Sequence, residues 1–112
     1  MDIYQQALER LGITLTTEVL DSAQYKERTQ VYDFDMAYYR RGLSLSPGNE
    51  QMLYWGSYGV EQPGTRNWMG MNAPAAEAMI AKLVSSSSRE DFLAAAKALD
   101  RILTAGRYVI PI

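Results

Sequence analysis

The stretch ITLTTEVLDSAQYKERTQVYDFDMAYYR, residues 13–40, carries the strongest signals for the fold. Its first part, Ile13 to Leu20, is rich in Thr, Val, Leu and Ile with period-two alternation, which favours a strand because branched side chains pack well on a pleated face. Asp21 then opens a predicted helix that runs to about Tyr32, and Phe34 to Arg40 alternates again as a second strand. Strand, helix and strand joined this tightly predict a right-handed β-α-β crossover with parallel strands, and therefore an α/β fold class.

Helices are also expected outside this unit, from the spacing of apolar residues and from start and stop signals, at about residues 3–11, 49–55, 74–84 and 88–106. The last of these has two possible capping boxes, Ser87 with Glu90 or Ser88 with Asp91. Gly12 is well suited to the left-handed residue that ends the first helix.

A final strand is predicted at residues 108–112 because the segment is apolar and contains Pro111, which confines it to an edge or a strand end. We therefore expect one α/β unit, in which the two later helices cover the crossover and the final strand extends it. The connection 56–72 contains four glycines and Pro63 and is unusually long. Loops of that length in a compact domain are typically functional or rest on another part of a larger protein.

Composition excludes several classes of function. A chain of 112 residues has room for a single domain, residues 1–112, and its net charge of -2 gives no excess of Lys and Arg for nucleic acid. The absence of Cys and His removes thiolate nucleophiles, the commonest general base and the commonest metal ligands. We therefore expect no enzyme activity, no metal and no cofactor. No stretch is long and apolar enough for a membrane span, and no signal peptide is visible.

Three motifs then follow one another in a specific order. They are SLSPGNEQ at 44–51, WGS at 55–57 and PGTRN at 63–67. With them, LERLGITLTTEVLDSAQYKERTQVYDFDMAYY at the front and LDRILTAGRYVIPI at the end extend the likeness over essentially the whole chain. The chain resembles extracellular solute-binding protein family five, and within it the branch that includes the binding proteins of microcin C and peptide importers.

This resemblance implies part of one lobe of a type II periplasmic binding-protein fold. The parent would be a longer, periplasmic protein of two lobes that closes on a ligand, and its signal peptide would lie outside this chain. The implied function is non-covalent capture of peptides or peptide-like solutes for an ABC importer. The implied partners are the ligand, the remaining lobe and the permease in the membrane.

The candidate site follows from the expected sheet, since ligands bind beyond the carboxyl ends of parallel strands. Arg40 and Arg41 would grip a carboxylate or phosphate there. The plainer explanation, which the sequence favours, is that they are solvated or paired with Glu50 and Asp35. We predict ligand contacts from Tyr39, Arg40, Arg41, Gly42, Leu43, Ser44, Trp55, Arg66 and Asn67.

The roles of Leu43, Arg66 and Asn67 each have an alternative. Leu43 stands where many relatives carry an Asp that pairs with a peptide amino terminus, so a free amine is not necessarily the group recognised. Arg66 and Asn67 either anchor their loop or reach into the cleft. The alternative function is a small stand-alone interaction domain that uses the aromatic loop 54–71.

Overall fold

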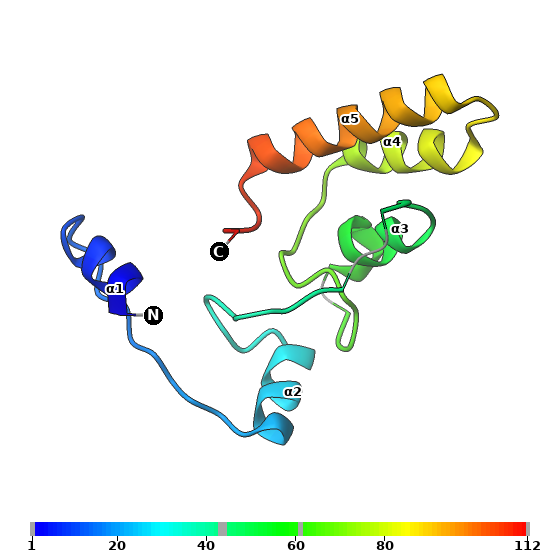
Figure 1. Ribbon diagram of the computed structural model, residues 1–112. Coiled ribbons are helices and arrows are strands. Elements are labelled where there is room, and N and C mark those ends of the chain that lie inside the picture. Colours follow the sequence, from blue (N-terminus) through cyan, green and yellow to red (C-terminus); the bar gives the residue numbers. More distant parts are fainter. Residues whose placement is uncertain (1, 43–44, 61, 112) are drawn as a thin grey trace.

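The computed structural model describes residues 2–42, 45–60 and 62–111, and the regular secondary structure in these ranges is entirely helical (Figure 1). The elements in chain order are α1 (Asp2–Glu9), α2 (Ser22–Gln30), α3 (Glu50–Trp55), the 3-10 turn η1 (Ser57–Gly59), α4 (Pro74–Ser85) and α5 (Arg89–Gly106). Helices α4 and α5 lie side by side as an antiparallel pair, with α3 against α4. Helices α1 and α2 lie away from this pair.

The predicted β-α-β crossover is wrong, and so is the α/β fold class. Residues 13–20 and 34–40 have no strand assignment, and no sheet occurs in the described part of the chain. A strand needs a neighbour for its backbone N–H and C=O groups, and the described ranges supply none. Val19 is 91% exposed, so the alternation at 13–20 buries no continuous face here. Of the three predicted pieces, only the central helix forms.

The predicted final strand is also absent from the described residues. Residues 108–111 have no regular secondary structure and are exposed, and residue 112 lies outside the described ranges. Pro111 lacks a backbone N–H, so it adds no donor that could recruit a neighbouring strand.

The ends of the first two helices follow directly from the sequence. Gly12 has a φ of 77°, and its N–H donates to Glu9 O at 2.9 Å while Ile13 N–H donates to Leu8 O at 3.0 Å. This pair of bonds is a Schellman motif, which confirms Gly12 as the left-handed residue. Asp21 caps α2 by accepting from two backbone N–H groups, and Gln24 completes a capping box.

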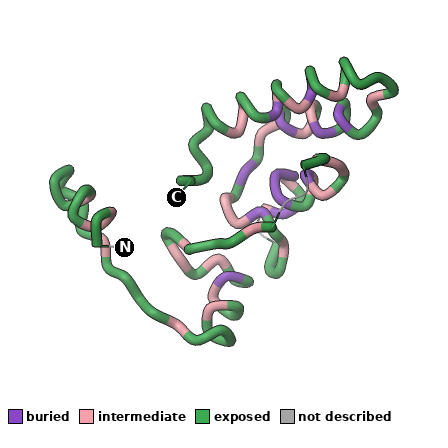
Figure 2. Tube along the Cα trace, in the orientation of Figure 1, coloured by how far each residue is buried: buried purple, intermediate pink, exposed green. Residues whose placement is uncertain are grey.

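The core lies between α3, α4 and α5 (Figure 2). Buried side chains on the facing sides of α4 and α5 are Ala76, Ile80, Leu83, Ala95 and Leu99. At the start of α5, Ser88 Oγ accepts from Asp91 N–H at 3.1 Å, which decides between the two possible caps. At its other end, α5 ends in a left-handed residue at Arg107, with a φ of 52°, directly after Gly106.

The chain exposes far more surface than a compact domain of its size. Its accessible surface is 8605 Å², against about 6200 Å² expected for a folded monomer of this mass. Its radius of gyration is 16.3 Å, against about 13 Å for a compact chain of this length. Helix α1 contributes no buried residue. None of the helices in the described part is long and apolar enough to cross a membrane.

Candidate ligand-binding site

The loop between η1 and α4 is fixed from within by Asn67, whose side chain is completely buried. Its amide nitrogen donates to Gly56 O at 3.0 Å and to Met71 O at 2.8 Å, and its amide oxygen accepts from Met71 N–H at 2.9 Å. A buried amide is costly to leave unpaired, and here both of its ends bond the backbone. In the described structure Asn67 therefore anchors the loop, and its predicted ligand contact remains a prediction.

A second set of bonds ties the same loop to the end of α2. The Tyr32 hydroxyl donates to Gly59 O at 2.9 Å and also contacts Thr65 Oγ1. Thr65 Oγ1 in turn donates to Gly59 O at 2.7 Å, and Gly64 N–H donates to Gln30 O at 2.9 Å. Segments about thirty residues apart in the chain are thus held together.

Trp68 packs against three aromatic rings from the first half of the chain. Tyr39 approaches it edge-on with ring centroids 4.7 Å apart, and Tyr25 and Phe34 do so at 6.2 Å. Edge-to-face pairs of this kind are favourable because the positive ring edge meets the negative ring face. Tyr39, a predicted ligand contact, thus packs against Trp68 while remaining half exposed at 49%.

The main cluster of predicted site residues surrounds Tyr54, which is buried on α3. The Arg41 guanidinium carbon lies over the Tyr54 ring, 3.1 Å from its centroid, and 5.9 Å from the Trp55 ring. On the same ring, the Arg66 guanidinium carbon lies 5.7 Å from the centroid, and its Nη1 donates to the Tyr54 hydroxyl at 3.1 Å. Two cations therefore share one aromatic residue.

No described carboxylate neutralises these two cations within ion-pair distance. Both ion pairs in the described ranges belong to Arg28, with Glu18 and with Asp33. Arg41 Nε is buried and has no hydrogen-bond partner. Burial lowers the pKa of Arg41, and the fields of Tyr54, Tyr39 and Glu50 only partly oppose that effect. Of the alternatives considered for Arg40 and Arg41, an ion pair with Glu50 or Asp35 is not present among the described residues.

The Glu50 carboxylate is hydrogen-bonded to groups at the start of α3. Its Oε1 accepts from Gly48 N–H at 3.0 Å and from Gln51 Nε2 at 3.2 Å. Hydrogen bonds to the charged form, led by the Gly48 N–H, lower the pKa of Glu50. The carboxylate therefore stabilises the turn before α3 rather than clamping Arg41.

The remaining predicted residues are placed unequally. Arg40 and Gly42 are exposed at the end of the extended segment, and Leu43 and Ser44 lie outside the described residues. Trp55 is buried, and its indole N–H donates to Gln51 Oε1 at 3.1 Å. The structure thus joins Arg41, Trp55 and Arg66 around one centre.

That centre, Tyr54, is the residue that the predicted set lacks. Its position within a run of aromatic residues was visible in the sequence. The run does not indicate which of these rings the two arginines contact. A useful signal was the phenol itself, because a buried tyrosine hydroxyl needs a hydrogen-bond partner. Arg66, distant in sequence, supplies it.

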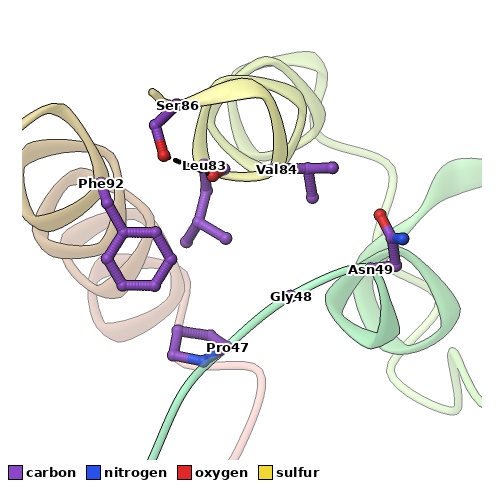
Figure 3. A pocket seen from close by; sticks show the side chains of 7 residues that line it. All are labelled: Pro47, Gly48, Asn49, Leu83, Val84, Ser86 and Phe92. Atoms are coloured by element: carbon purple, nitrogen blue, oxygen red, sulfur yellow. Dashed lines mark hydrogen bonds between the residues drawn. The ribbon is translucent and has the colours of Figure 1, made fainter. Parts of the chain in front are cut away.

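A separate groove lies where the segment before α3 meets the turn between α4 and α5 (Figure 3). Pro47, Leu83 and Phe92 form its apolar sides, and Ser86 Oγ donates to Leu83 O at 2.8 Å. It is open to solvent and contains none of the predicted ligand contacts. No group of acidic side chains suited to a metal ion occurs in the described ranges.

The sequence places the chain among homologues that are named as binding proteins, and it fits a fragment of a solute-binding protein, as the resemblance implied. No family model matches it. It is 45% identical over 109 residues to a Brucella melitensis protein named provisionally as a binding protein. It is 41% identical to the Agrobacterium fabrum probable peptide-binding protein YejA and 38% identical to the peptidoglycan-binding protein YepA of the same organism.

These similarities cover 96–97% of this chain but only 18% of the length of each of the three relatives. The chain therefore corresponds to a small part of each relative. Their names describe binding and no catalysis, which agrees with the expectation of a non-enzymatic role.

Proposed function

We propose that the chain is a segment of the ligand-binding lobe of a periplasmic solute-binding protein, which captures peptides or peptide-like solutes and delivers them to an ABC permease. The observation that carries this proposal is the 38–45% identity to binding proteins over nearly the whole chain. Two of those relatives are named for peptides and for peptidoglycan. Since peptidoglycan contains peptide stems, the two names share a peptide-like ligand.

The excess surface of the chain supports a role as one part of a larger body. About 2400 Å² more is exposed than a compact monomer of this mass would expose. The residues before α2 account for part of it, because Ile3, Leu11 and Val19 are all strongly exposed. Large apolar side chains left exposed together in this way mark surface that other protein normally covers.

Capture would combine backbone hydrogen bonds to an extended ligand with pockets for its side chains. The two lobes would close because the ligand contacts both of them only in the closed state, which shifts the population toward closure. Within this segment, the cations around Tyr54 are the groups best suited to hold a ligand.

The alternative of a stand-alone interaction domain gains no support from the loop 54–71. Tyr54 and Trp55 are buried in the core, and Trp68 is surrounded by Tyr25, Phe34 and Tyr39. Only Tyr58 among these loop aromatics is classed as exposed. One exposed ring is a small surface for a protein partner.

Uptake measurements test the import role. Deleting the gene that contains this segment should reduce uptake of a radiolabelled mixture of tri- to hexapeptides, and restoring the gene should restore uptake. Uptake of a free labelled amino acid serves as the control and should not change. Unchanged peptide uptake in the deletion strain would contradict the proposed transport role.

A further inference from the structure

We infer that Arg41 and Arg66 form a site for a carboxylate group of the ligand. Arg41 lies over the Tyr54 ring, and Arg66 donates to the Tyr54 hydroxyl. This inference rests on the proposed capture of peptides and adds the chemical group that this segment recognises. It also separates Arg41 from its neighbour Arg40, which the sequence alone could not do.

The first support is the unbalanced charge of the cluster. Two guanidinium groups lie 3.1 Å and 5.7 Å from one ring centroid, and within the described ranges neither has a carboxylate at ion-pair distance. Cation–π contact and the Tyr54 hydroxyl hold the cations in place without cancelling their charge. Such a pair attracts an anion.

The second support is the unmet hydrogen-bonding capacity of Arg41. Its Nε is buried without a partner, and a buried donor without a partner costs about 1–3 kcal/mol. An exposed arginine would give that N–H to water. Because Nε is covered here, water does not satisfy it, and Arg41 retains hydrogen-bonding capacity that its protein contacts leave unused.

The third support is the geometry of the guanidinium group. Its planar fork matches the two oxygens of a carboxylate, so one arginine binds bidentately and a second adds charge and orientation. Trp55, 5.9 Å from the Arg41 guanidinium, provides an apolar wall that strengthens such a contact by excluding water. Arg40 is exposed and shares none of these contacts.

The test compares peptides with and without a carboxylate, using the natural full-length protein. Two randomised tripeptide mixtures, one with free carboxyl termini and one amidated, are offered, and retained peptides are quantified by mass spectrometry. We expect the wild type to retain free acids at least about tenfold better than amidated peptides without Asp or Glu, as one charge-assisted contact predicts. Arg41→Gln and Arg66→Gln should each lose most of this preference.

Two further variants separate binding from folding. Arg101→Gln removes an exposed arginine on α5 and should leave the preference intact. Arg41→Lys keeps the charge but loses the fork, so it should retain an intermediate preference even if Arg41→Gln folds poorly. If amidated peptides are retained only when they contain Asp or Glu, and the variants abolish that enrichment, the carboxylate belongs to a ligand side chain.

The outcomes distinguish this inference from the proposed function. Equal retention of acids and amides, without enrichment of acidic residues, would refute the carboxylate site while leaving peptide capture intact. A preference that survives in both glutamine variants would place the site elsewhere and refute it as well. If the wild type retained no peptide, peptide capture itself would fail, and the site with it.

Discussion

At the scale of single residues, Asn67 decides whether the loop that carries Arg66 keeps its shape. Replacing it by Ala leaves Gly56 O, Met71 O and Met71 N–H without their partners in a buried position. We expect Asn67→Ala to lower the free energy of unfolding by about 2–4 kcal/mol, measured by urea unfolding of the full-length protein. Asn72→Ala is the matched control, since Asn72 is exposed and should change stability by less than about 0.5 kcal/mol. Equal urea midpoints for the two variants would contradict this role.

The hydrogen bonds of the Glu77 carboxylate predict that stability depends on pH. Its Oε1 accepts from Ser57 Oγ at 2.6 Å and from Ser57 N–H at 2.7 Å, and these bonds lower its pKa below the ordinary value of 4.5. A group with a lowered pKa in the folded state stabilises the protein above its unfolded pKa and loses that contribution as pH falls through the folded pKa. The stability difference between wild type and Glu77→Gln should therefore be constant above about pH 5.5 and shrink on further acidification. Urea unfolding from pH 7 to pH 3.5 measures it, and a difference that grows in acid would contradict the assignment.

Predictability from sequence was uneven at this scale. Gly12 and Asp21 act through neighbours within a few residues, so their patterns were sufficient, whereas the pattern at the start of α5 left Ser87 and Ser88 as alternatives. Arg41 and Arg66 could be named as candidates, but their meeting at Tyr54 depends on contacts between segments far apart in the chain. Patterns within a short stretch of sequence do not predict contacts between distant segments.

At the scale of elements, the start of α5 gives a direct test of the two capping patterns. Ser88 Oγ accepts from Asp91 N–H and donates to Asp91 Oδ2 at 2.7 Å, whereas Ser87 is exposed without a cap role. Ser88→Ala should lower the free energy of unfolding by about 0.5–2 kcal/mol, and Ser87→Ala by much less. Thermal unfolding followed by circular dichroism compares them. A larger effect for Ser87→Ala would overturn the assigned cap.

The helices were predictable and the strands were not, for a physical reason. A helix satisfies its backbone within one segment, so the amphipathic patterns of α4 and α5 were enough to locate them, together with Pro74 at the start of α4 and the cap at the start of α5. A strand forms only against another strand. The alternation at 13–20 and 34–40 shows which side chains a strand would bury, but it does not identify a partner strand. Extended, unpaired backbone is the result in the described structure.

At the scale of the whole molecule, the segment before α2 should be covered in the full-length protein. Leu11 and Val19 are exposed by 74% and 91%, which is unusual for side chains of their size. Hydroxyl-radical footprinting should modify both side chains rapidly in the isolated chain and slowly in the full-length protein. Equal, fast modification in both would show that no other part of the protein covers this segment.

The central claim is that these residues help to hold a peptide-like solute in a larger binding protein. Mass spectrometry of the small molecules that co-purify with the natural full-length protein under gentle conditions tests it most directly. The account predicts peptides or peptide-containing fragments, released intact when the protein is denatured. Recovery of a different class of solute, or of a reaction product made by the protein itself, would contradict it.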